Sequence, residues 1–216
     1  MIKKAYPLRV YRISLKLVDQ TINYNFTEIE QRILFWLISY LRKKENIEEI
    51  KLCAFKTAVS LEHLSISTIE KYLYSMNKKI ESILLNEKNN ENETLSLFKV
   101  FEIKEYYLLV DEIYGKYLNI QKNEEFESYF VVEKPYTQYR YADYLKMKGK
   151  YSKRFLLLFM TYRKYGQKEF KMDIFKEKMG FPKSYRMTNI TKYLNESIEE
   201  NKIYMATIWK IRKKAE

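Results

Sequence analysis

The chain has 216 residues, of which 46% are hydrophobic, and its formal net charge is +12 at pH 7. It contains one cysteine and one histidine, which excludes an internal disulfide framework and leaves no ligand set for a zinc site. The longest apolar runs, residues 33–38 and 155–160, are far shorter than the ~20 residues of a membrane span, and the first residues lack the apolar core of a signal peptide. We therefore expect a cytoplasmic protein with no membrane partner.

The positive charge is concentrated in one part of the chain. Residues 1–133 contain 19 Lys and Arg against 20 Asp and Glu, whereas residues 134–216 contain 21 against 8. A genome-wide bias toward lysine would spread lysine along the whole chain and would not remove acids from one end. This asymmetry favours a polyanionic partner for the C-terminal part; a solvated basic face without a partner is the alternative.

Two amphipathic helices are predicted in the first half, after an extended N-terminal piece. Thr27 and Glu30 have the spacing of a capping box, and apolar residues recur every four positions over the following residues 29–41. Residues 49–55 suggest a short strand. A second helix over 65–85 repeats the pattern, with Ser67 and Glu70 as its predicted capping box.

A hairpin is expected to follow these helices. Residues 93–113 contain two β-rich runs on either side of Lys104-Glu105, a pattern typical of paired strands. A set of helices followed by a β-hairpin is the element order of a winged-helix domain. The acidic, turn-rich segment 119–128 then separates the halves, so we expect an N-terminal domain at 1–128 and a C-terminal domain at 129–216. The predicted fold class is mainly α with small β-hairpins (α+β).

In the second half the sequence predicts a short helix, a kink at Gly149 and a long core helix over about 152–165 that Gly166 ends. A short extended segment follows, and after it a short helix that Asp173 is expected to cap and that ends at Gly180.

Residues 178–194, KMGFPKSYRMTNITKYL, predict a helix-turn-helix. Gly180 ends the first helix, Phe181 can enter the core, and Pro182 prevents the helix from continuing. The second helix is amphipathic, with the apolar stripe Ile190, Leu194 and Ile198. The alternative is a surface turn between two ordinary helices.

The polar residues around the start of this second helix are candidates for DNA contact. Lys183 and Arg186 can neutralise phosphate or read guanine, and Asn189 can pair with adenine. The full set is Lys183, Ser184, Tyr185, Arg186, Thr188, Asn189 and Lys192.

A second cluster lies at the predicted start of the core helix: Lys150, Tyr151, Ser152, Lys153 and Arg154. A helix N-terminus favours an anion, and cations placed there cost stability unless phosphate neutralises them. The alternative is a set of lysines whose stems pack along the helix while their charges remain in water.

No catalytic constellation is present in the sequence. The phosphate-binding pattern GxxxxGK[ST] does not occur, and the single histidine, His63, lies among apolar residues. A relaxase-type nickase would need a pair of histidines beside its tyrosine. We therefore expect no enzyme, no cofactor and no metal.

Two stretches resemble a known family. Residues 141–166 and 175–200, which contain KGKYSKRF and GFPKSYR, resemble the second winged-helix domain of the initiator replication proteins of iteron plasmids, the RepA/RepB type. Residues 23–39 are similar to the opening helix of that family. The resemblance is strong over about 141–200 and only topological over 44–133.

This resemblance implies two tandem winged-helix domains that bind direct repeats of double-stranded DNA at a plasmid origin. The second domain would dominate major-groove recognition, while the first would add contacts or mediate a dimer. The family helps to open an AT-rich duplex and recruits host DnaA and the replicative helicase. In this chain only residues 201–216 follow the recognition helix, with one possible strand at 203–211, so the second wing is expected to be truncated.

Two other functions are compatible with the same sequence features. A transcriptional autorepressor needs only the helix-turn-helix, and a protein-interaction module would use winged helices without binding DNA.

Overall fold

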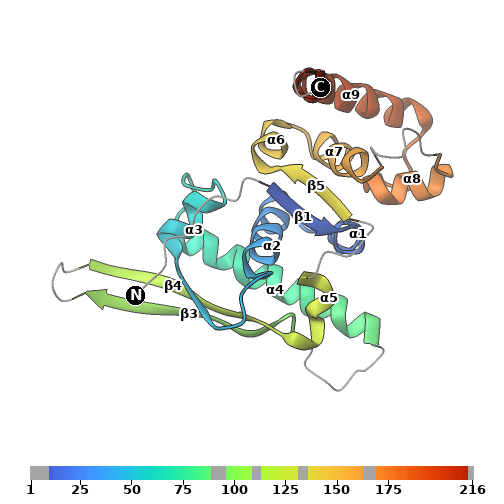
Figure 1. Ribbon diagram of the computed structural model, residues 1–216. Helices are drawn as coiled ribbons and strands as arrows, with labels where there is room; N and C mark the ends of the chain where they lie inside the picture. Colours follow the sequence, from blue (N-terminus) through green and yellow to red (C-terminus); the bar gives the residue numbers. More distant parts are fainter. Residues whose placement is uncertain (1–9, 89–95, 109–112, 131–135, 163–168, 214–216) are drawn as a thin grey trace. The chain divides into compact units, whose positions relative to one another are not determined.

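The computed structural model describes residues 10–88, 96–108, 113–130, 136–162 and 169–213, and it divides the chain into two compact units (Figure 1). The first unit contains Tyr24–Glu133, and the second contains Arg9–Asn23 together with Lys134–Glu216. The predicted boundary at residue 128 lies close to this division. Residues 9–23, which we expected in the N-terminal domain, belong instead to the second unit.

The first unit has the element order of a winged helix. Its elements are α2 (Glu28–Leu41), β2 (Glu48–Lys51), α3 (Leu52–Ala58), α4 (Ile66–Lys88), β3 (Phe98–Leu108), β4 (Ile113–Lys122), the 3-10 turn Glu124–Phe126 and α5 (Glu127–Phe130). The predicted apolar stripes form the core: Ile33, Leu37 and Leu41 of α2 are buried, as is the stripe of α4 from Ile69 to Ile83.

The hairpin of the first unit is longer than the sequence suggested. β3 runs without a break through Lys104 and Glu105 and pairs with β4, and β4 pairs with β2 to complete an antiparallel sheet in the order β2-β4-β3. The prediction of a turn at Lys104-Glu105 was wrong because both charges lie on exposed positions and are paired, Lys104 with Glu102 (2.9 Å) and Glu105 with Lys116 (3.4 Å). The segment expected as a linker, 119–128, is the end of β4 followed by the 3-10 turn and the start of α5.

One predicted capping box is confirmed and the other is wrong. The Thr27 side chain accepts from the Glu30 backbone N–H (3.2 Å), and the Glu30 carboxylate accepts from the Thr27 N–H (2.7 Å). The residue that caps α4 lies two positions earlier than predicted. Ser65, rather than Ser67, accepts a hydrogen bond from the backbone N–H of Thr68 (3.2 Å). Glu70 instead forms an ion pair with Lys116 (2.9 Å).

The second unit is built from a two-stranded sheet and five helices among its described residues. They are β1 (Val10–Ser14), α1 (Leu15–Asn23), β5 (Tyr136–Arg140), α6 (Tyr141–Lys146), α7 (Lys150–Tyr162), α8 (Met172–Met179) and α9 (Met187–Lys213). β1 pairs antiparallel with β5, and α9 packs against α7. The segment 10–23 was expected to be extended throughout, but its second part is α1. The expected stop at Gly166 lies outside the described residues.

α9 is a single helix of 27 residues. The strand suggested for residues 203–211 is wrong, since these residues continue the helix. No glycine or proline occurs after Pro182, so no residue interrupts the backbone hydrogen bonds there. Among the described residues of the second unit, no strand follows α9, and the hairpin that would form a second wing is absent from them.

Candidate nucleic-acid interface

The turn between α8 and α9 has a defined geometry that begins at Gly180. Gly180 adopts a left-handed backbone conformation, with φ 61° and ψ 36°, in which glycine carries no steric penalty. Its N–H donates to the Glu177 carbonyl (2.9 Å), and the next N–H, that of Phe181, donates to the Lys176 carbonyl (2.8 Å). These bonds end α8 at the predicted residue. Asp173 does not cap the other end, because Lys171 occupies that position.

An apolar cluster beneath the turn fixes the angle at which α9 leaves it. Phe181 is buried, as expected, and its ring lies 4.4 Å from that of Tyr151 on α7, centroid to centroid. Met179 and Ile190 complete the buried cluster, and Tyr193 packs against it. Because α7, α8 and α9 all contribute, the start of α9 is held by both neighbouring helices.

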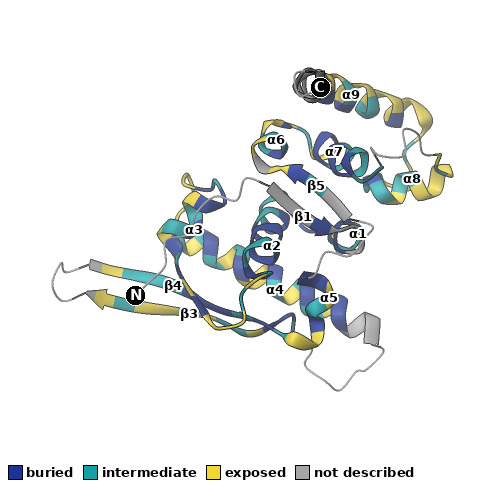
Figure 2. Cartoon of the chain, in the orientation of Figure 1, coloured by how far each residue is buried: buried dark blue, intermediate teal, exposed yellow. Residues whose placement is uncertain are grey.

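The residues predicted on the turn and the start of α9 lie at the surface (Figure 2). Tyr185 is half-buried and packs against the ring of Phe181 (6.0 Å between centroids). The other six are exposed: Lys183, Ser184, Arg186, Thr188, Asn189 and Lys192. Three of them are cations on a short segment, which suits contacts to a phosphate backbone.

Asn189 has a structural role in the turn. Its side-chain Oδ1 accepts a hydrogen bond from the backbone N–H of Arg186 (3.3 Å), the residue before α9. This is the arrangement by which a residue in the first turn satisfies a free N–H at the start of a helix. A bidentate contact with adenine would need the same oxygen, so the geometry favours a capping role for Asn189.

The cluster at the start of α7 differs from the expectation in its exposure. α7 begins at Lys150, two residues before the predicted start at about Ser152, and Lys150 is exposed. Tyr151, Ser152 and Lys153 are buried, and the Lys153 ammonium lies 5.6 Å from the centre of the Tyr144 ring. Arg154 donates from Nη1 to the Met179 carbonyl (2.9 Å), so it supports the α8–α9 turn. Of the five residues, only Lys150 presents its charge at the surface.

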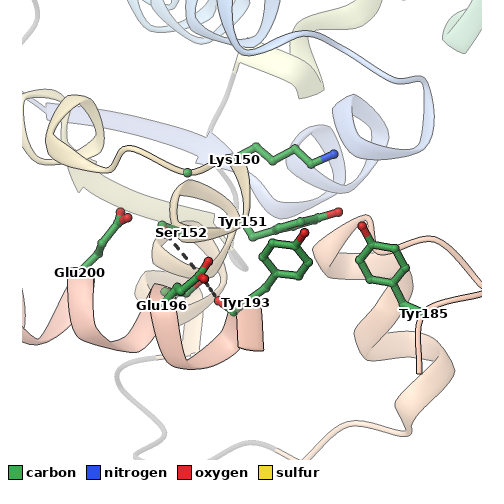
Figure 3. Close-up of a pocket in the computed structure, with 9 residues that line it drawn as sticks. Lys150, Tyr151, Ser152, Tyr185, Tyr193, Glu196 and Glu200 are labelled. Carbon is green, nitrogen blue, oxygen red and sulfur yellow. Dashed lines mark hydrogen bonds between the residues drawn. The ribbon is translucent and has the colours of Figure 1, made fainter. Parts of the chain in front are cut away.

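Three tyrosines meet beside Lys150 in a cavity of about 330 Å³ between α7 and α9 (Figure 3). Burial and a hydrogen bond to Tyr185 raise the pKa of Tyr151 to about 12. A hydrogen bond to Tyr185 also raises the pKa of Tyr193. The hydroxyls of Tyr151 and Tyr193 are therefore neutral at physiological pH, and their hydrogen bonds to Tyr185 join α7 and α9 to the turn.

Acidic residues limit the positive surface along α9. Glu196 and Glu199 are exposed, and Glu200 accepts a hydrogen bond from the Lys148 N–H (3.0 Å). Carboxylates at this position would repel phosphate. The surface suited to DNA therefore extends from Lys183 to about Asn195, which is the turn and α9 as far as the start of its third helical turn.

The sequence reasoning missed two residues of this surface, Met187 and Thr191. Met187 is 56% exposed and Thr191 is also exposed. Thr191 lies four residues after Met187, and Met187 lies three residues before Ile190, so Met187 continues the predicted apolar stripe to the exposed start of α9. This spacing was the signal that could have identified them.

The first unit has an exposed polar face on α4, the third helix of its winged-helix order. Ser67, Lys71, Tyr74 and Lys78 are exposed along it. The Tyr74 ring makes an edge contact with Phe101 of β3 (6.5 Å between centroids), which connects this face to the hairpin.

The part of the chain that the structure describes contains neither a cluster of metal ligands nor a helix that could span a membrane. No group of three or more His, Cys, Asp or Glu lies close enough there to hold a metal ion. None of the described helices combines the length and the apolar character that crossing a membrane requires.

Comparisons with known proteins identify the family. A solved structure of the Pi initiator protein in complex with iteron DNA is similar to this chain with a TM-score of 0.50 and 17% sequence identity, over 92% of this chain and 86% of that one. This likeness shows a shared winged-helix fold. No curated protein matches the chain. The family model for the initiator replication protein, WH1, matches residues 14–160. Since the match extends over more than half of the chain, the protein belongs to this initiator replication protein family.

Proposed function

We propose that this protein is a sequence-specific DNA-binding initiator of plasmid replication, which recognises direct repeats of double-stranded DNA in the cytoplasm. The observation that carries the proposal is the exposed, basic start of α9, held in place by the αL turn at Gly180. A helix presented in this way can enter the major groove with its N-terminal residues toward the bases.

The distribution of contacts follows from the side chains. Arg186 carries a planar guanidinium that can bind both acceptors of guanine. Lys183 and Lys192, as flexible point charges, suit phosphate, as does the exposed Lys150. In the first unit, the α4 face with Lys71 and Lys78 supplies additional phosphate contacts.

Initiation in this scheme requires no enzymatic step by the protein itself. Binding at the repeats would deform an adjacent AT-rich duplex, because such sequences are flexible and cheap to distort. A second copy of the chain, host DnaA and the replicative helicase are the partners we propose for the assembled origin.

The proposal is tested by titrating the protein against two duplexes of equal length and composition at one fixed salt concentration. One duplex carries the repeats that flank the gene, and the other is a scrambled version. We expect binding to the repeats to be at least about 10³-fold tighter, as is typical of specific recognition. Equal affinities for the two duplexes would refute an initiator role.

Arg186→Ala examines base reading in the same assay. We expect a loss of about 1–3 kcal/mol on the repeat duplex and a much smaller loss on the scrambled one. Lys192→Ala is the comparison, since loss of a phosphate contact weakens both duplexes alike. A parallel loss for Arg186→Ala would assign that residue to the backbone instead.

A further inference from the structure

Three of the exposed residues in the first two turns of α9 carry a methyl group, which can make apolar contacts. In its first two turns the exposed residues are Met187, Thr188, Asn189, Thr191 and Lys192. Met187 is the first residue of the helix, and more than half of its side chain is exposed. Thr188 follows it in sequence and Thr191 lies one helical turn further on, and each has a methyl group beside its hydroxyl.

Few side chains of this surface can read bases by paired hydrogen bonds. Arg186 is the only arginine between residues 181 and 202. Asn189 uses its oxygen to cap the helix, and the ammonium group of Lys192 is a point charge without a fixed planar geometry. The tip of α9 therefore offers an exposed apolar side chain, Met187, beside few groups that can form paired hydrogen bonds with a base.

Thymine is the base whose major-groove edge carries an apolar group, the C5-methyl. We propose that Met187 reads thymine by packing against this methyl, with the methyl groups of Thr188 and Thr191 extending the contact along the groove. The inference rests on the proposed function and specifies how the site distinguishes one base. It predicts that the preferred DNA site contains thymine where the tip of α9 lies.

Substituting deoxyuridine for thymine tests the inference, because it removes the C5-methyl and leaves base pairing unchanged. The preferred site is first selected from a random-sequence duplex pool with the wild-type chain. Each thymine of the selected site is then replaced singly by deoxyuridine. At one or more positions we expect binding to weaken by about fourfold, the effect of leaving one buried methylene-sized group in water.

Met187→Ala assigns the effect to this side chain. The variant should bind the thymine duplex several-fold more weakly and should no longer distinguish thymine from deoxyuridine at that position. Met172→Ala is the matched control, since Met172 is also exposed (40%) but lies on α8. It should retain the full discrimination. Thermal unfolding of both variants confirms that they fold.

The possible results separate the two proposals. Failure to enrich any sequence from the pool overturns the proposed function and the inference together. An enriched site without thymine, or deoxyuridine effects that persist in Met187→Ala, overturns only the inference. Loss of the discrimination in Met187→Ala alone supports it.

Discussion

Gly180 and Arg154 depend on each other at the α8–α9 turn. A Cβ atom added at Gly180 would lie 1.6 Å from Arg154 Nη1, and the backbone there has a positive φ. Gly180→Ala must therefore strain the backbone, at roughly 1–2 kcal/mol, and displace a guanidinium that is hydrogen-bonded to the Met179 carbonyl. We expect a destabilisation of about 2–4 kcal/mol in urea unfolding.

Gly149→Ala provides the matched control for that measurement. The nearest atom to its added Cβ would be Ser152 Oγ, at 3.2 Å, and the φ of Gly149 does not lie in the left-handed region. This variant should lose no more than about 1 kcal/mol. Similar losses for both glycines would show that the αL conformation at Gly180 is not what the fold requires.

Glu30 is a buried acid whose charge the first unit needs. Its carboxylate accepts from Lys79 Nζ and from Ser75 Oγ, each at 2.6 Å. Burial by itself would raise the pKa of Glu30, but these bonds and those from Thr27 outweigh it, so the pKa lies below the ordinary value of 4.5. The resulting stabilisation is complete above pH 4.5 and is lost as the pH falls through the folded-state pKa.

Glu30→Gln should therefore cost about 2–4 kcal/mol of unfolding free energy at pH 7. The difference from wild type should be smaller at pH 3 than at pH 7, because the unfolded chain takes up a proton at Glu30 below the ordinary pKa of 4.5 and the stabilisation by the charge diminishes. Denaturant unfolding at both pH values measures this, with the exposed Glu62→Gln as the control that changes little at either. A difference that stays constant with pH would contradict the assigned charge.

Some residue-scale features follow from local spacing and others need the tertiary structure. The Thr27–Glu30 capping box could be predicted because both partners lie within one turn. The burial of Lys153 could not, because it depends on the Tyr144 ring, which comes from a separate helix. For the same reason Arg154, expected at phosphate, binds the carbonyl of Met179.

At the scale of elements, the start of α9 depends on the cap that Asn189 provides. Asn189→Ala leaves the Arg186 N–H without its intramolecular partner, and we expect a loss of about 0.5–1 kcal/mol of stability. Asn195→Ala, at an exposed position in the third turn, should be neutral or slightly stabilising, because alanine favours helix. Thermal unfolding compares the two. If Asn195→Ala proves as costly, the cap is not the cause.

Element types were predictable where a periodic pattern was long, as for α2 and α4. The ends of elements were less predictable. Ser65 and Ser67, for example, can both cap the start of α4, and only packing selects one of them. The sequence prediction divided β3 at Lys104-Glu105, because the local charges do not reveal that Lys116 is the cross-strand neighbour of Glu105. In α9 the β-favouring residues after Lys202 continue a helix that nothing in the sequence interrupts.

At the scale of the whole molecule, the positive charge is distributed unequally between the two units, and this distribution favours a main DNA contact made by one of them. The excess of cations lies in residues 134–216, which contain the α8–α9 turn, whereas residues 24–133 of the first unit contain 14 Lys and Arg against 19 Asp and Glu. Long-range attraction would therefore bring the second unit to DNA first. The first unit would then add the weaker contacts of α4. In the proposed mode of binding, the acids from Glu196 onward would limit how far the main contact extends along α9.

The salt dependence of DNA binding tests where this contact ends. Each lysine that neutralises a phosphate adds about 0.9 to the slope of log affinity against log salt concentration. Lys183→Ala and Lys192→Ala should each reduce the slope by about that amount. Lys202→Ala should leave it unchanged, because Lys202 lies beyond the acidic residues and pairs with Glu199. Lys183, Lys192 and Lys202 are all exposed and carry the same charge, so they differ in their position along the turn and α9 and, for Lys202, in the ion pair with Glu199. Equal reductions for the three would mean that the duplex runs further along α9 than its acidic residues allow, and the major-groove placement of its first two turns would have to be abandoned.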